Sequence, residues 1–113
     1  MEFENRPWGS YRVLLDDGNC KVKKITVKPK QSLSYQLHHR RSEDWFFISG
    51  IAVVTIDGKE RSYSHGEKVH IPVFTKHCVR NDTEEDVVFI EIQTGEYFGE
   101  DDIIRISDMY GRC

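Results

Sequence analysis

Closely spaced turn signals are the feature that most constrains the fold of this chain. Pairs such as Asp17-Gly18, Ser49-Gly50, Asp57-Gly58 and His65-Gly66 interrupt the sequence repeatedly. Between them lie short runs rich in β-branched and aromatic residues, a composition typical of strands. The expected strands are Ser10–Leu15, Cys20–Lys28, Ser32–His38, Asp44–Ser49, Ile51–Asp57, Lys59–Tyr63, Lys68–Pro72, His77–Asn81 and Asp86–Gln93. Short strands joined by tight turns predict an all-β sandwich or barrel.

Length and composition exclude several classes of protein. The 113 residues predict a single domain, 1–113. A net charge of −3 is too balanced for a dedicated nucleic-acid surface. The longest apolar runs, such as Trp45–Ile48, are far shorter than the ~20 residues that span a bilayer. Three cysteines without a C-x-x-C pair argue against a disulfide framework or a cysteine zinc site. Because Met1–Asn5 lacks the basic and apolar regions of a secretory leader, we expect a cytoplasmic domain without membrane or nucleic-acid partners.

Side-chain alternation predicts which faces of the strands are buried. In Ser32–His38, polar residues share one face and apolar residues the other: Ser32, Ser34, Gln36 and His38 against Leu33, Tyr35 and Leu37. The apolar face suits packed protein, and the polar face suits the lining of a cavity. In Cys20–Lys28, where lysines interrupt strict alternation, the expected buried set is Cys20, Val22, Ile25 and Val27. Glu100–Ser107 fits a helix or a strand.

Two groups of polar residues lie at the ends of expected strands. Gln36 and His38 project to one side of an extended strand, and Glu43 can return on the adjacent strand. A short loop after Pro72 delivers His77 at the start of another strand. One amide oxygen, one carboxylate and two imidazole nitrogens suit Zn²⁺, Mn²⁺, Fe²⁺, Co²⁺ or Ni²⁺. We therefore predict that Gln36, His38, Glu43 and His77 bind a divalent metal ion, with Zn²⁺ as the expected ion.

These two groups resemble the paired signature of the cupin superfamily, G-x5-H-x-H-x3,4-E-x6-G and G-x5-P-x-G-x2-H-x3-N. Two glycines of the signature are replaced here by Lys30 and Phe74, and the first histidine is replaced by Gln36. The resemblance implies an all-β, cupin-type double-stranded β-helix, a jelly-roll barrel.

The glutamine at position 36 and the two ends of the chain point to one family within this superfamily. Gln36–Trp45, together with Arg6–Tyr11 and Gly95–Arg105, is similar to the isomerase domain of type II mannose-6-phosphate isomerases, over roughly residues 5 to 112. The resemblance implies interconversion of mannose 6-phosphate and fructose 6-phosphate through an enediol, in carbohydrate metabolism and nucleotide-sugar biosynthesis. In that family the domain often follows a mannose-1-phosphate guanylyltransferase. Since no Gly-rich phosphate loop occurs here, we expect no guanylyltransferase activity from this chain, and the resemblance makes a separate guanylyltransferase chain a possible partner.

Further roles follow from the resemblance and from position along the chain. Arg41 and Lys76 flank the metal motifs and are the candidates to bind the substrate phosphate at the cavity rim. Arg12 and Arg105, inside the terminal motifs, are weaker candidates. His39 and Glu91 are both candidate catalytic bases, and no sequence feature decides between them.

Other functions remain open at this point. The main alternative is a non-catalytic, metal-containing cupin that binds a sugar or sugar phosphate. A metal-dependent oxygenase is less compatible with Gln36, because a neutral amide in place of an imidazole weakens the binding of redox iron. Small β-barrels commonly cover their strand edges with a second copy, so we expect a homodimer.

Overall fold

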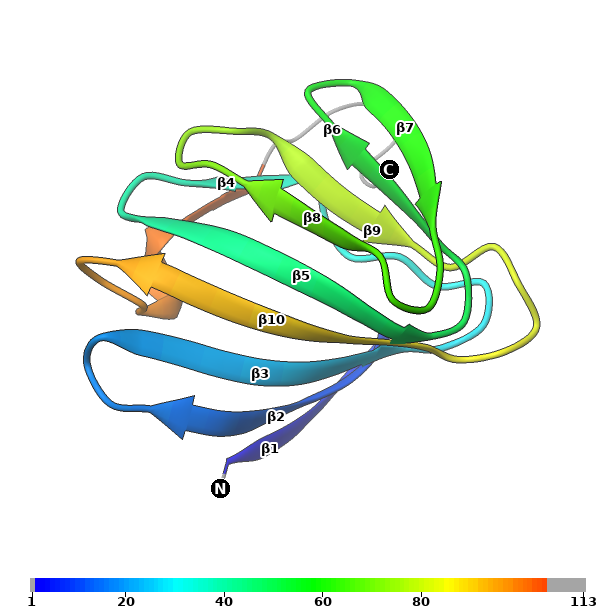
Figure 1. The fold of residues 1–113 in the computed structure, drawn as a ribbon, viewed down its shortest axis with the longest axis horizontal. Helices are drawn as coiled ribbons and strands as arrows, with labels where there is room; N and C mark the ends of the chain where they lie inside the picture. The colour runs from blue at the N-terminus through cyan, green and yellow to red at the C-terminus, as the bar shows by residue number, and fades with distance from the viewer. Residues whose placement is uncertain (1, 106–113) are drawn as a thin grey trace.

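Two antiparallel sheets make up the fold, as the computed structural model describes it for residues 2–105 (Figure 1). The larger sheet contains, in spatial order, β1 (Phe3–Arg6), β2 (Gly9–Asp16), β3 (Cys20–Val27), β10 (Val87–Gly95), β5 (Arg41–Ser49) and β8 (Lys68–Ile71). The smaller sheet contains β11 (Ile103–Arg105), β4 (Gln36–His38), β9 (His77–Arg80), β6 (Ala52–Ile56) and β7 (Lys59–Tyr63). A short 3₁₀ turn, η1 (Glu100–Asp102), precedes β11.

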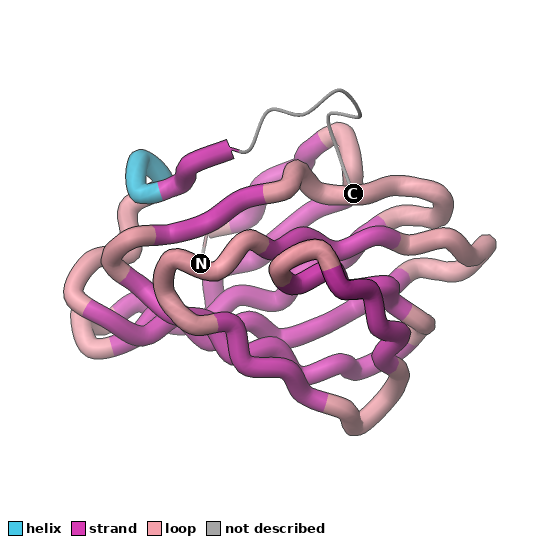
Figure 2. Tube along the Cα trace, turned by 90° about the horizontal axis from the view of Figure 1, so that it is seen from above, coloured by secondary structure: helices cyan, strands magenta, loops and turns pink. Residues whose placement is uncertain are grey.

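The order of the strands confirms the predicted double-stranded β-helix. From β4 to β11 the chain passes back and forth between the two sheets, and only the β6–β7 hairpin stays within one sheet. That hairpin turns at Asp57-Gly58, as the sequence predicts. Strands dominate the described part of the chain (Figure 2), and it contains no helix with the length and apolar character needed to cross a membrane.

The hydrophobic core fills one end of the space between the sheets. Its fully buried side chains come from facing strands of both sheets: Val27, Phe47, Ala52, Val54, Ile71, Val79, Val87 and Phe89. Along β5 and β10 every second residue is buried, so the alternation predicted from the sequence decides which side chains enter this core.

Two expected elements differ from those in the structure. Only Gln36–His38 of the expected strand Ser32–His38 forms a strand, because only these residues pair with β11, and β9 pairs with β4 at Gln36 alone. Ser32 makes an isolated bridge to Arg80 instead. At the other end, Glu100–Ser107 begins with the 3₁₀ turn and continues as β11, and its last two residues lie outside the described part of the chain.

The two residues that stand in place of signature glycines keep a backbone conformation that favours glycine. Lys30 has a φ of 63° and Phe74 has a φ of 61°, both in the left-handed region that favours glycine. The loops therefore keep their form at a cost of about 1–2 kcal/mol for each residue.

Candidate metal centre

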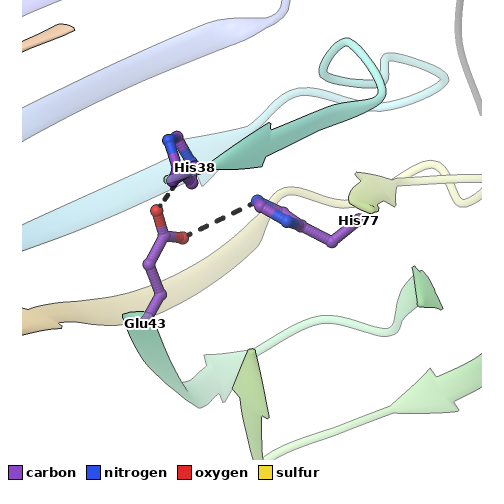
Figure 3. Close-up of side chains that lie close together, drawn as sticks. All are labelled: His38, Glu43 and His77. Atoms are coloured by element: carbon purple, nitrogen blue, oxygen red, sulfur yellow. Dashed lines mark ion pairs between the residues drawn. The ribbon is translucent and has the colours of Figure 1, made fainter. Parts of the chain in front are cut away.

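Two strands of the smaller sheet and one of the larger sheet bring His38, Glu43 and His77 together (Figure 3). His38 ends β4, Glu43 lies near the start of β5, and His77 begins β9. The Nε2 atom of His38 lies 3.0 Å from Oε2 of Glu43, and Nε2 of His77 lies 3.9 Å from Oε1. All three side chains are almost completely buried. The structure thus brings together three of the four residues predicted as metal ligands, as a group able to hold an ion.

Backbone carbonyls orient both imidazole rings. Nδ1 of His77 lies 2.9 Å from the carbonyl oxygen of Thr75, and Nδ1 of His38 lies 3.3 Å from that of Asp102. In His77 this contact favours the tautomer in which Nδ1 carries the hydrogen, which leaves the lone pair of Nε2 directed at Glu43. Burial lowers the pKa of His77 although the Glu43 carboxylate acts to raise it. The neutral imidazole that a metal requires is thereby favoured.

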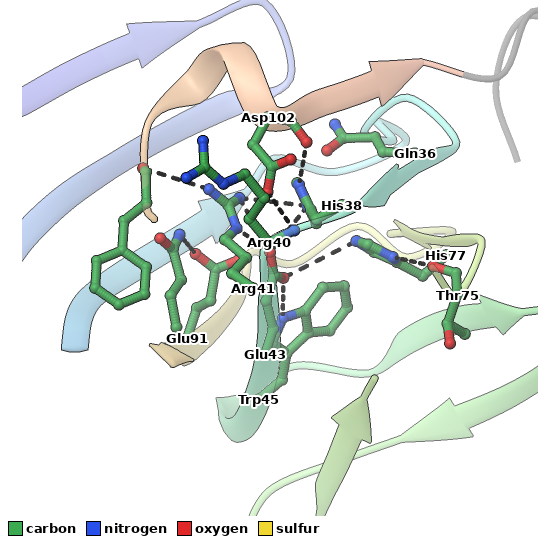
Figure 4. A network of polar contacts seen from close by, with 12 residues as sticks. Gln36, His38, Arg40, Arg41, Glu43, Trp45, Thr75, His77, Glu91 and Asp102 are labelled. Atoms are coloured by element: carbon green, nitrogen blue, oxygen red, sulfur yellow. Dashed lines mark hydrogen bonds and ion pairs between the residues drawn. The ribbon is translucent and has the colours of Figure 1, made fainter. Parts of the chain in front are cut away.

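Two donors fix the Glu43 carboxylate (Figure 4). The indole Nε1–H of Trp45 donates to Oε1 at 2.9 Å, and the guanidinium of Arg41 donates to Oε2 through Nε at 3.1 Å. Burial acts to raise the pKa of Glu43, but the hydrogen bond with His38 and the interactions with His77 and Arg41 outweigh it. The pKa therefore lies well below its usual value, and the group stays a carboxylate.

The donor set fits a divalent ion. Nε2 of His38 and Oε2 of Glu43 lie 3.0 Å apart, and Nη2 of Arg41 lies 3.3 Å from the first atom and 3.0 Å from the second. Ligand atoms about 2.1 Å from a tetrahedral ion lie about 3.4 Å apart, close to the separations measured here. A cavity of about 30 Å³ lined by Glu43 and His77 leaves room for an ion.

Gln36, the fourth predicted ligand, lines the same small cavity. It is the cross-strand partner of His77, and its amide nitrogen donates to Oγ of Ser34 at 2.8 Å. This contact leaves the amide oxygen as the atom available to an ion. Gln36 as a ligand stays a prediction.

A larger pocket of about 280 Å³ opens beside the metal centre. Gln36, Arg41 and Glu91 line both this pocket and the small cavity, so they mark where the two spaces meet. Glu91 is buried on β10, and Nε2 of Gln93 donates to its Oε1 at 2.5 Å. Burial, and then the charge of Glu43, raise the pKa of Glu91.

The other predicted site residues lie in different surroundings. Arg41 is not at a rim, because its side chain is buried against Glu43. Lys76 is exposed and lines neither space. His39 is also exposed, and its ring lies 4.9 Å from that of Phe74, away from the metal centre. Arg12 lies over the ring of Phe3, in a separate hollow.

Several residues of the site were not predicted. Lys23 is buried and lines the larger pocket, whereas Val22, expected in the buried set, is only partly buried. Every second residue counted back from Val27 is Ile25 and then Lys23, so strict strand alternation would have predicted that Lys23 is buried. Asp102 accepts hydrogen bonds from the backbone N–H groups of His39 and Arg40, and so holds the turn between β4 and β5. No local signal marks this role, because it joins segments far apart in the sequence.

Comparison with known proteins assigns this architecture to a family. Residues 2–108 match the family described as "Mannose-6-phosphate isomerase C-terminal". A protein of Escherichia coli named mannose-1-phosphate guanylyltransferase is 44% identical over 108 residues, which are 96% of this chain and 23% of the relative. The chain therefore spans about a quarter of the length of that relative.

Solved structures agree on the fold. The structure of KdgF from Halomonas sp. superimposes with a TM-score of 0.79 at 16% identity, over 89% of this chain and 90% of that one. The cupin domain of Cnp3 from Schizosaccharomyces pombe gives a TM-score of 0.73 at 9% identity, over 76% of this chain and 64% of that one. The predicted cupin-type fold is confirmed.

Proposed function

The chain belongs to the mannose-6-phosphate isomerase C-terminal family, and from this we propose that it is a metal-dependent isomerase that interconverts mannose 6-phosphate and fructose 6-phosphate. The observation that carries the proposal is the buried His38–Glu43–His77 group beside a pocket with a further carboxylate, Glu91. A metal-capable group beside a candidate base offers the Lewis acid and the proton carrier that an enediol route of aldose–ketose isomerisation can use.

The ligand set defines the metal's part in this proposal. Gln36, His38, Glu43 and His77 would hold a divalent ion, with Zn²⁺ as the expected ion. When bound, the ion polarises the substrate carbonyl as a Lewis acid and stabilises negative charge that develops on oxygen.

Glu91 is the better of the two candidate bases. The reaction removes a proton from C2 of the open-chain aldose and returns it to C1, while a second proton moves between the two oxygens. Glu91 lines both spaces where they meet, and its hydrogen bond with Gln93 fixes the carboxylate. His39 is exposed and lines neither space. We therefore propose Glu91 as the residue that carries the proton between C2 and C1.

A direct assay tests the proposal. Metal-loaded protein is incubated with mannose 6-phosphate, and fructose 6-phosphate is measured. We expect turnover in the native protein, none above background in His77→Ala, and a loss of about 10²–10⁴-fold in kcat for Glu91→Gln with its metal content unchanged.

The outcomes separate the alternatives. Equal background from the native protein and His77→Ala would contradict isomerase activity, and calorimetric binding of mannose 6-phosphate would then favour the non-catalytic sugar-phosphate binder. Full turnover in Glu91→Gln would remove Glu91 as the base. The homodimer, the separate guanylyltransferase chain and the cytoplasmic location stay predictions that these assays do not test.

A further inference from the structure

Four cationic side chains line the larger pocket beside the metal centre. They are Arg6, Lys23, Arg41 and Arg105, and Glu91 is the one acidic residue of the lining among the described residues. Such an excess of positive charge, focused by low-dielectric walls, attracts an anion. The volume of about 280 Å³ lies at the lower end of the range for small-molecule sites and is too small for a folded partner.

Arg105 is placed by a row of residues that crosses the smaller sheet. Arg105 on β11 pairs with Gln36 on β4, and Gln36 pairs with His77 on β9. Residues directly opposite each other in antiparallel strands project to the same face. Two strand spacings separate Arg105 from His77, about 10 Å between their backbones. A hexose with its carbonyl end at His77 therefore has its far end near Arg105.

Arg6 approaches the same pocket from the other sheet. It ends β1, and its guanidinium pairs with Glu4 at 2.8 Å, with both side chains about 40% exposed. Exposed pairs of this kind are weak, so the Arg6 guanidinium can exchange Glu4 for a ligand at little cost. No carboxylate among residues 2–105 forms an ion pair with Arg105.

Lys23 adds positive charge at the inner wall. Its residue is only 5% exposed, and its ammonium lies 4.3 Å from the centre of the Tyr11 ring. Lys23 is also the cross-strand partner of Glu91 and lines the same pocket as the two outer arginines, so its charge lies beside the candidate base.

We propose that Arg6 and Arg105 bind the phosphate group of a sugar phosphate whose carbonyl end lies at the metal centre, with Lys23 adding charge behind them. This assignment rests on the proposed function. A planar guanidinium pairs with two phosphate oxygens at once, and two arginines from opposite sheets can hold the group from both sides. Arg41 and Lys76, the residues predicted from the sequence, are less suited, because Arg41 is engaged by Glu43 and Lys76 lies outside the pocket.

Calorimetric titration of the metal-loaded protein tests the phosphate site without requiring turnover. The probes are mannose 6-phosphate and unphosphorylated mannose, and the variants are Arg6→Ala and Arg105→Ala. Each variant is expected to weaken binding of mannose 6-phosphate by about tenfold or more, because a hydrogen bond to a charged group is lost, while any binding of mannose stays unchanged. Arg105→Lys should recover part of the loss. Arg61→Ala is the matched control, because Arg61 lies on β7 and pairs with Glu67 outside the pocket.

The results distinguish this assignment from the proposed function. Native affinity for mannose 6-phosphate in both arginine variants would overturn the phosphate site, and so would a loss confined to Lys76→Ala. Weakened binding in both variants of a protein without turnover would support the phosphate site while contradicting the isomerase. Unchanged KM in an active Arg6→Ala, Arg105→Ala double variant would leave the isomerase standing and overturn the phosphate site.

Discussion

The inward face of the larger sheet has an apolar half and a polar half, built on the same three strands. On β3, β5 and β10 the apolar half contains Val27, Phe47 and Phe89, and the polar half contains Lys23, Glu43 and Gln93. Both halves are buried and both follow the same alternation. The backbone therefore decides which side chains enter the barrel, and their chemical type decides whether the space becomes core or site.

Trp45 lies at the boundary between the two halves. Its ring centroid lies 4.8 Å from that of Phe89 and 5.7 Å from that of His77, and its N–H donates to Glu43. Trp45 thus contributes to hydrophobic packing through its ring and to the orientation of a candidate metal ligand through its N–H. Substitutions in the three zones should separate these contributions.

The largest effect on stability is expected in the apolar half. Phe47→Ala should lower the free energy of unfolding by about 3–5 kcal/mol, because it removes a fully buried ring and leaves a cavity. Phe46→Ala is the matched control. Phe46 is the next residue on the same strand but 39% exposed, and its truncation should cost less than about 1 kcal/mol. Equal losses in urea denaturation would contradict the division into an inward and an outward face.

A smaller effect is expected at the boundary, and on metal affinity more than on stability. Trp45→Phe keeps an aromatic ring and removes the hydrogen bond to Glu43. Loss of such a partner should weaken metal binding by about 10–100-fold, measured by competition with a chelating dye. Trp8→Phe serves as the control, because Trp8 makes no contact with the three candidate ligands among the described contacts. Unchanged affinity in Trp45→Phe would show that Glu43 does not need this donor.

The smallest effect is expected outside both halves, at Lys30. Lys30→Gly should raise the free energy of unfolding by about 1 kcal/mol or less, because glycine adopts a positive φ without steric cost. Lys28→Gly should have the opposite sign, since Lys28 is not among the residues with positive φ and gains only flexibility. Thermal denaturation of both variants checks the pair. Destabilisation by Lys30→Gly would show that its contact with the carbonyl oxygen of Asp82 outweighs the strain.

Local patterns predicted the part of this molecule that depends on alternation and turns. The spacing of His38, Glu43 and His77 at strand ends was enough to predict their convergence, and the Asp57-Gly58 hairpin followed from its turn residues. Arg105 was only a weaker candidate from the sequence, because its position beside the pocket depends on the pairing of β11 with β4 across more than half of the chain. His39 and Lys76 are close in sequence to the candidate ligands but do not line the pocket, since His39 follows the end of β4 and Lys76 precedes the start of β9, where both are exposed.

Arg41 was predicted at the cavity rim but is buried, and the reason differs from that for His39 and Lys76. Its position two residues before Glu43 puts both side chains on the same inward face of β5, where the carboxylate engages the guanidinium. Sequence reasoning treated Arg41 as a free cation, because the partner that neutralises it was already assigned to the metal.

Metal content of purified protein tests the central claim most directly. After loading with Zn²⁺ and removal of excess ion, the native protein should retain one tightly bound ion per chain, measured by plasma mass spectrometry. The double variant His38→Ala, His77→Ala should retain none while its circular dichroism spectrum still shows a folded β protein. Equal retention by both proteins, or no retention by the native protein, would contradict the assignment of His38, Glu43 and His77 as a metal centre.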